Sequence, residues 1–295
     1  MKRKSYSLIV PLAVATFIFQ SCGSSGDKSN NSDEFKAAEE SLKNQIEEVV
    51  YNIPSPSEIP YLLQATGAEF NQSLINANAK ASTYATRNDK AALNLGVYAA
   101  DIGYLSSYDK SQEAIDYLNS CKLLADNLGV IGSFDVEVLK KFESNISNKD
   151  SLAYLLNKTI NQTESFLKND SRNRLAALVL TGSFIEGLYI STGIVKTYPK
   201  NGLTDEQRNL VLTNLMRVIL EQKKSVSELL KMLSTIDQSE PVAGLVTDLK
   251  TLEADYAALN IEEQIKSNKA NLVLTDAKLV SITSVVEKIR KGIVE

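Results

Sequence analysis

Apolar residues recur every three or four positions along most of the chain, which is the period of an α-helix with one buried face. The pattern is clearest over residues 204–235, where one apolar stripe is interrupted by charged residues. This stripe consists of Leu210, Leu212, Leu215, Val218, Ile219, Val226, Leu229, Leu230 and Leu233. The period and its boundary signals predict helices over 34–51, 61–86, 89–107, 110–128, 134–147, 150–168, 172–197, 204–235, 241–259 and 276–291. The sequence therefore predicts an all-α fold, a multi-helix bundle.

Two of the predicted helices, 89–107 and 172–197, are apolar nearly all round and rich in Ala and Gly. A helix without a polar face is buried, so we expect these two helices at the centre of the bundle. Glycines inside them, such as Gly96 and Gly182, would allow neighbouring backbones to approach closely.

Turn and cap residues set the predicted boundaries. The candidate N-caps are Asp89, Asp109, Asp150 and Thr204. Gly129 is expected just past a helix end, and the prolines of 54–60 are expected to exclude helix there. Residues 269–275 would suit one short strand, although no second strand-like run exists to pair with it.

The N-terminus combines a basic start, an apolar run and a cysteine. Basic residues at positions 2–4 precede an apolar run over 8–19, which is too short to span a bilayer, and Cys22 follows directly after Gln20 and Ser21. This arrangement resembles a bacterial lipoprotein signal. The resemblance implies a signal peptide over 1–21, lipid attachment at Cys22, and a membrane partner held through the acyl chains.

The resemblance also divides the chain and suggests a location. Residues 22–33 are polar and read as a flexible tether, and 34–295 as a single all-helical domain with two related halves, about 61–147 and 150–260. Lipoproteins of this type are held in the cell envelope, here the outer membrane of a Gram-negative bacterium. Those sent to the outer surface carry acids soon after the cysteine, whereas Asp27 is the only acid before position 33, which favours the periplasmic face.

Composition narrows the function classes. Hydrophobic residues make up 43% of the chain and charged residues 23%, as in ordinary globular proteins. Removing the three basic residues of the signal takes the net charge from −4 to −7, so nucleic acid is not an expected partner.

The chain has no histidine, which excludes Ser-His-Asp and Cys-His catalysis and histidine-ligated zinc or di-iron sites. No cofactor or metal site is predicted, and Cys121, without a disulfide partner once Cys22 is lipidated, is expected to be a buried helix residue.

An internal duplication is indicated by an 85-residue offset, which aligns residues 68–106 with 153–191 without a gap. Eleven of the 39 aligned pairs are identical, more than a biased helical composition gives by chance. The predicted unit is a helical hairpin used twice. Two such units can pack about a pseudo-twofold axis and bring equivalent positions together.

The duplication places polar residues at matching positions on the two apolar helices. Asp101 aligns with Glu186, and each acid lies three residues before the aligned tyrosines Tyr104 and Tyr189. Residues three apart share a helical face, so these four could line one candidate ligand cleft for a cationic or polyhydroxylated ligand. The alternative is structural: each acid binds a neighbouring Arg, Asn or Tyr and holds the hairpins in register.

The segments 93–104 and 181–189, behind the lipoprotein-like N-terminus, resemble uncharacterised all-helical lipoproteins of Bacteroidetes. This resemblance implies location and fold but no activity. The favoured hypothesis is a lipid-anchored, non-enzymatic module, with no catalytic residue assigned, that binds an envelope protein or a small ligand. One alternative is a carboxylate-dependent enzyme acting on envelope glycans through Asp101 and Glu186. The other is a purely structural envelope protein.

Overall fold

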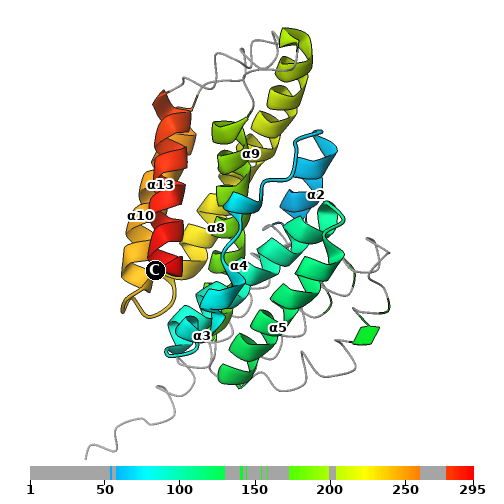
Figure 1. Ribbon diagram of the computed structural model, residues 1–295. Coiled ribbons are helices and arrows are strands. Elements are labelled where there is room, and N and C mark those ends of the chain that lie inside the picture. The colour runs from blue at the N-terminus through cyan, green and yellow to red at the C-terminus, as the bar shows by residue number, and fades with distance from the viewer. Residues whose placement is uncertain are drawn as a thin grey trace, which may run out of the picture. The chain divides into compact units, whose positions relative to one another are not determined.

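The computed structural model describes residues 58–129, 173–198, 204–259 and 277–295, together with isolated positions 54, 140, 141, 144, 154 and 158. These residues form eight α-helices and two short 3-10 helices, and none of them lies in a strand (Figure 1). The predicted all-α multi-helix bundle is therefore confirmed. The predicted signal peptide, the tether, the helix over 34–51 and the strand over 269–275 lie outside the described residues, as do nearly all residues of the helices over 134–147 and 150–168.

Two long helices, α4 (Asn88–Ser107) and α8 (Asn173–Thr197), form the centre of the bundle as predicted. Nearly every side chain along both helices is buried. Their backbones touch at glycines: a Cβ added at Gly96 would lie 2.0 Å from the carbonyl oxygen of Val179, and one added at Gly182 would lie 1.9 Å from that of Leu93. Only residues without a Cβ allow these helices to pack this closely.

By length and composition, α8 could also cross a membrane. Its most apolar window is 94% buried inside the bundle, however, and the core helix of a water-soluble domain passes the same test. No other helix among the described residues meets this criterion.

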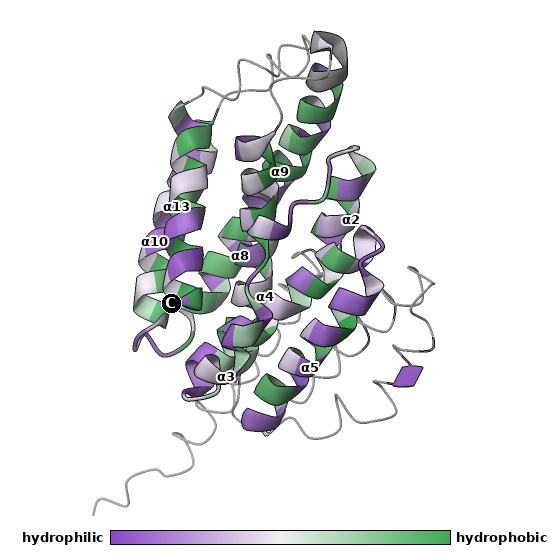
Figure 2. Cartoon of the chain, in the orientation of Figure 1, coloured by the Kyte–Doolittle hydropathy of each residue, from purple (hydrophilic) through white to green (hydrophobic). Residues whose placement is uncertain are grey.

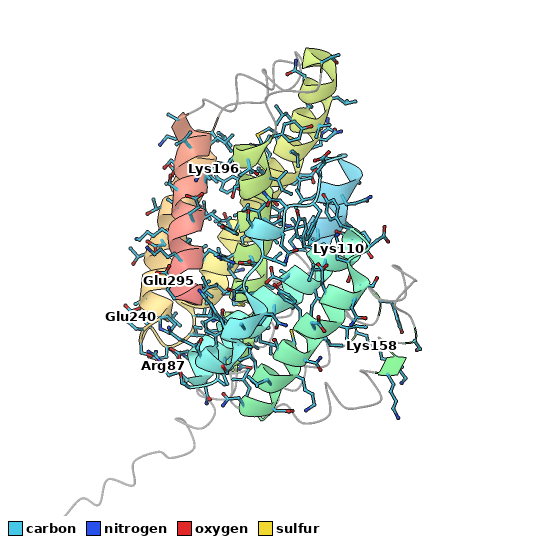
Figure 3. All side chains as sticks on the ribbon, viewed as in Figure 1. Arg87, Lys110, Lys158, Lys196, Glu240 and Glu295 are labelled. Carbon is cyan, nitrogen blue, oxygen red and sulfur yellow. The ribbon has the colours of Figure 1, made fainter. Side chains whose placement is uncertain are left out.

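The remaining helices cover this central pair (Figures 1 and 2). On α4 pack α2 (Glu58–Ala65) and α5 (Ser111–Asn127), while α9 (Asp205–Ser234) and α13 (Ala277–Val294) pack on α8. Helix α10 (Val242–Ala258) completes the second group by packing between α9 and α13. Each outer helix directs an apolar face inward, as Figure 2 shows by hydropathy, and labelled charges such as Arg87, Lys110, Lys196 and Glu240 lie on the outside (Figure 3).

The apolar stripe of α9 is buried as predicted, with one exception. Its members from Leu212 to Leu233 pack into the core, whereas Leu210 is 65% exposed. Cys121 on α5 is buried, which confirms the prediction for the lone thiol, and burial raises its pKa well above the usual range. Gly129 follows the end of α5 with a φ of +72°, also as predicted.

The predicted single helix over 61–86 is wrong. The structure instead has α2, two 3-10 helices, η1 (Gln72–Leu74) and η2 (Asn78–Lys80), and the short α3 (Ala81–Tyr84). Helix α2 ends before Gly67, whose φ of +82° suits glycine, and the Asn71 side chain accepts a hydrogen bond from the Ser73 amide at the start of η1. The expected exclusion of helix from 54–60 is also wrong in part, because α2 begins at Glu58 with Pro60 in its first turn, where proline is tolerated.

Two of the predicted N-caps have other roles. Asp109 ends α4: its φ is +62°, its amide donates to Ser106 O, and the Lys110 amide donates to Leu105 O, the bonding pattern of a Schellman motif. Helix α5 therefore begins at Ser111, two residues later.

Asp89 lies in the first turn of α4, not at its N-cap, which is Arg87. Its carboxylate pairs with the Arg87 guanidinium and accepts the Lys90 amide at 2.9 Å. Although burial opposes ionisation, these bonds lower the pKa of Asp89. A carboxylate in the first helical turn also interacts favourably with the helix dipole.

Candidate functional site

Asp101 and Glu186, the two acids that the 85-residue offset aligns, meet in the centre of the bundle. Asp101 projects from α4 and Glu186 from α8, and neither residue has any exposed surface. Their carboxyl groups lie close enough for the charge on Glu186 to raise the pKa of Asp101. The structure therefore brings these two aligned positions together, in a part of the bundle that solvent does not reach.

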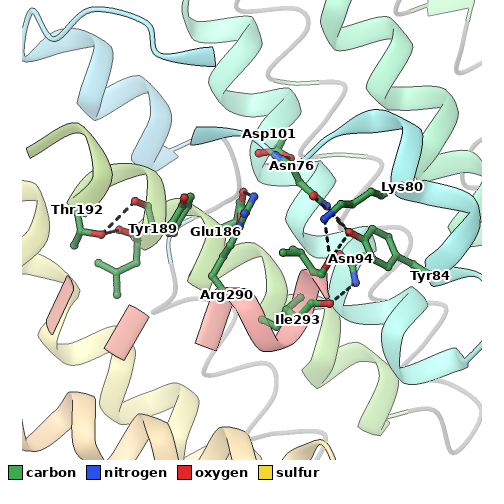
Figure 4. Close-up of polar contacts among 12 residues, drawn as sticks. Asn76, Lys80, Tyr84, Asn94, Asp101, Glu186, Tyr189, Thr192, Arg290 and Ile293 are labelled. Carbon is green, nitrogen blue, oxygen red and sulfur yellow. Dashed lines mark hydrogen bonds and ion pairs between the residues drawn. The ribbon is translucent and has the colours of Figure 1, made fainter. Parts of the chain in front are cut away.

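Arg290 of α13 neutralises Glu186. Its Nε donates to Glu186 Oε2 and its Nη2 donates to Glu186 Oε1, both at 3.0 Å, so that the two planar groups form a bidentate pair (Figure 4). The Arg290 side chain is only 15% exposed. Its guanidinium also lies over the Tyr189 ring, 4.5 Å from the ring centroid, in a cation-π contact. We call these three charged residues the Asp101–Glu186–Arg290 cluster.

Asp101 has a different set of partners. Its Oδ2 accepts the backbone N–H of Asn76 at 3.1 Å, whereas the buried Oδ1 has no hydrogen-bond partner. Burial and the neighbouring Glu186 charge raise the pKa of Asp101 well above its usual range. Burial raises the pKa of Glu186 as well, although Arg290 opposes this effect.

Asn76 connects this cluster to the rest of the bundle. While its amide donates to Asp101, its carbonyl accepts the Tyr117 hydroxyl at 2.7 Å, and its side-chain Nδ2 donates to the Tyr84 oxygen at 3.2 Å. Tyr84 in turn donates to the Val294 carbonyl at 2.9 Å. One asparagine between η1 and η2 thus connects α3, α4, α5 and the end of α13 (Figure 4).

The last carbonyls of α13 are satisfied by this same region. Asn94 Nδ2 donates to Ile293 O at 3.0 Å, and Lys80 Nζ joins Tyr84 at Val294 O. Carbonyls at a helix end have no partner within the helix, so these donors cap α13 against α3, η2 and α4.

The two tyrosines of the predicted cleft are separated. Tyr189 is half-buried and packs on Arg290, beside the acids. Tyr104 belongs to an aromatic group with Phe70 and Tyr108, at centroid distances of 5.1 and 5.0 Å, and its oxygen accepts the Asn71 amide at 2.9 Å. Burial raises the pKa of Tyr104 to about 12. The four predicted residues therefore do not line one cleft. Asp101, Tyr104 and Glu186 have no exposed surface, and Tyr104 packs in its own aromatic group, apart from the acids.

The cluster offers little for chemistry on a substrate. Both carboxyl groups are fully buried and bonded within the protein, and a glycosidase needs its two carboxyls to flank a bound sugar. Over the described ranges, no group of three or more Cys, Asp or Glu residues is arranged to hold a metal ion. The geometry instead matches the structural interpretation, in which each acid binds a neighbouring donor.

The sequence analysis missed Arg290 and Asn76. One signal for Arg290 was available: it lies four residues after Val286 and three before Ile293, which places it on the apolar face of its own helix. A lone cation on such a face indicates a buried partner of opposite charge. Asn76 had a weaker signal, since it aligns with an identical residue, Asn161, at the 85-residue offset.

In fold and site, the chain is an all-α bundle built around a buried ion pair. Comparison with protein-family models, with curated proteins and with solved structures found no match to this chain.

Proposed function

We propose that this chain is a lipid-anchored helical protein of the bacterial cell envelope that acts as a binding or interaction module and not as an enzyme. The observation that carries the proposal is the N-terminal order of basic residues, short apolar run and Cys22, followed by a polar stretch and then a folded helical unit. Such an order suits a protein that is exported, fixed by acyl chains and held away from the bilayer by its tether.

We place the anchor at Cys22 and the folded part at the outer membrane, with the periplasmic face favoured. A single acyl chain gives only marginal membrane binding, and two or more chains give stable anchoring, so a lipidated cysteine needs no spanning helix. The burial of α8 within the bundle agrees with this arrangement, because the most apolar described helix is already covered by protein.

The proposal of a non-enzymatic role rests on the absence of histidine from the chain and on the burial and pairing of Asp101 and Glu186. Without histidine, the chain has no access to the commonest general base, and an enzyme would depend on Asp, Glu, Lys, Tyr or Ser. The two acids singled out by the sequence are buried and paired. A partner protein or small ligand of the envelope would then bind elsewhere on the bundle.

The anchoring is tested by replacing one cysteine at a time in a Gram-negative host grown with a clickable fatty acid. We expect wild-type protein to carry the label and to sediment with membranes, Cys22→Ser to lose both properties, and the matched control Cys121→Ser to retain both. Label on Cys22→Ser, or its absence from the wild type, would refute the proposed anchor.

The interaction half of the proposal is tested by site-specific photo-cross-linking in the same cells from exposed positions on separate helices, Leu123 of α5 and Val280 of α13. A binding module predicts a discrete adduct from one face of the bundle. The absence of an adduct from both positions would contradict the proposed interaction role.

A further inference from the structure

The Asp101–Glu186–Arg290 cluster contains two carboxyl groups and one guanidinium, which leaves one acid without a positive partner. We infer that the folded chain holds one proton between Asp101 and Glu186, and that release of this proton weakens the attachment of the C-terminal helix α13. This inference does not depend on the lipid anchor.

The contacts decide where the proton lies. Both oxygens of Glu186 accept hydrogen bonds from Arg290, which identifies Glu186 as the ionised acid. Asp101 Oδ2 accepts from the Asn76 amide, so the oxygen that remains for a proton is Oδ1, which is buried and has no hydrogen-bond partner. Two bare carboxylate oxygens would repel one another there, whereas an Oδ1 hydroxyl donates to Glu186 and satisfies both groups.

Among the described residues, Arg290 is the cation bound in this cluster, and the nearby Lys80 of η2 is directed to the Val294 carbonyl, at 3.4 Å. Besides Arg290, the side chains that interact electrostatically with Asp101 are neutral or can become negative. They are Glu186, Tyr84, Tyr98, Tyr117 and Cys121. Helix α2, which also packs on α4, has Tyr61, half-buried, and Glu58, exposed at its first residue. Burial and the Glu186 charge both raise the pKa of Asp101, in agreement with a retained proton.

Loss of the proton would act on α13 through Arg290. A second buried negative charge would appear beside Glu186, and both carboxylates would compete for the one guanidinium that α13 provides. One of the polar caps at the end of α13 runs through Asn76, whose amide binds Asp101 and whose side chain binds Tyr84, the donor to Val294 O. Two polar attachments of this helix, through Arg290 and through Tyr84, are therefore connected to the same proton.

The direction of the pH effect follows from the raised pKa of Asp101. A group whose pKa is higher in the folded chain stabilises that state fully at low pH, and the contribution is lost as the pH rises through the folded value. One linked proton changes the opening equilibrium by at most about tenfold per pH unit. The protection of α13 amides should thus fall by up to that factor per unit between the pKa of Asp101 in the opened chain and its pKa in the folded chain.

The test combines infrared spectroscopy with hydrogen exchange on the full chain. The key variant is Asp101→Asn, whose amide nitrogen takes the place of the Oδ1 hydroxyl and whose oxygen still accepts from Asn76. The matched control is Asp255→Asn: Asp255 is also buried and binds Lys278 and Ser281 of α13, and these hydrogen bonds outweigh burial and lower its pKa. Asp255 is thus an ionised acid that joins α10 to α13.

We expect the wild type to show the carbonyl stretch of a protonated carboxylic acid at neutral pH, Asp255→Asn to keep it and Asp101→Asn to lose it. Exchange protection of α13, corrected for the intrinsic pH dependence of exchange, should fall with rising pH in the wild type and stay constant in Asp101→Asn. Should Asp101→Asn fail to fold, the wild type alone decides, because protection of α13 must fall with rising pH while the band is present and must level off as the band fades. A neutral-pH spectrum without the band, or protection of α13 that does not change with pH while the band is present, would overturn the inference.

Discussion

Replacing Gly96 by alanine should force the two central helices apart. The added Cβ would lie 2.0 Å from Val179 O and 2.6 Å from Ser183 N, which are both backbone atoms of α8. Cβ atoms essentially never come within 3.0 Å of another heavy atom, so α4 and α8 would have to separate by about 1 Å at this point. Neither obstacle can rotate away, because both belong to the backbone.

The expected loss of stability can be worked from that distance. A gap of about 0.5–1 Å removes a quarter to a half of the attraction between facing atoms, and overpacking of a filled core costs about 1–3 kcal/mol. Because the walls are rigid, we take the upper end of this range, from which the better helix propensity of alanine recovers about 1 kcal/mol. The net loss is then about 2 kcal/mol in the free energy of unfolding.

Urea unfolding followed by far-ultraviolet circular dichroism measures this loss as a drop of roughly 1 M in the midpoint, with an unchanged slope. The matched control is Gly292→Ala on α13, where an added Cβ has nothing within 4 Å and stability should stay the same or rise slightly. Gly182→Ala should resemble Gly96→Ala, and the double variant should lose less than the sum, since one separation relieves both clashes. Equal midpoints for Gly96→Ala and Gly292→Ala would refute the reasoning.

Three further predictions follow from the polar contacts and the lone thiol. Arg290→Met should lower the free energy of unfolding by about 3–5 kcal/mol because it leaves Glu186 buried without its cation, whereas Lys288→Met, which breaks an exposed pair, should leave the urea midpoint nearly unchanged. Because the pKa of Asp255 is lowered in the folded chain, its ionised carboxylate stabilises the fold above the unfolded pKa of about 3.9, and this stabilisation is lost as the pH falls through the folded pKa. The Asp255→Asn variant should therefore flatten the acid limb of a plot of melting temperature against pH. Cys121 should react with a thiol reagent only as fast as the chain unfolds, and rapid reaction of the native protein would contradict its burial.

The fold was predictable wherever one physical signal dominated. Continuous apolar character placed the two central helices correctly, and both begin and end within about one residue of prediction. The segment 61–86 failed because its helical period is interrupted by local effects that the period does not report, namely the left-handed turn at Gly67 and the side-chain cap of Asn71. Asp109 failed for a related reason, since aspartate suits both a helix start and the left-handed end of the preceding helix.

The site was predictable only in its two acids. The 85-residue offset paired Asp101 with Glu186, and the structure brings these positions together; the duplication itself stays a prediction, because the described residues do not include the second hairpin's first helix. Arg290 could not be paired with them from sequence, since it lies 104 residues beyond Glu186 and no local spacing connects the two. Tyr104 shares a face with Asp101 in sequence, but the segment before η1 covers it and supplies its partners.

The buried charges also explain why α4 and α8, which are apolar nearly all round, pack in a single register. A shift of α4 against α8 by one turn would bring residues with a Cβ against the facing backbone, in place of the close contacts at Gly96 and Gly182. Any such shift would separate Asp101 from Glu186 and leave buried acids without partners, which is far more costly than an apolar mismatch. The same requirement selects the position of α13, because Arg290 can form its bidentate pair only when that helix lies against Glu186. Close glycine contacts and the pairing of Asp101 with Glu186 therefore favour the same alignment of the central helices, and Arg290 holds α13 against it.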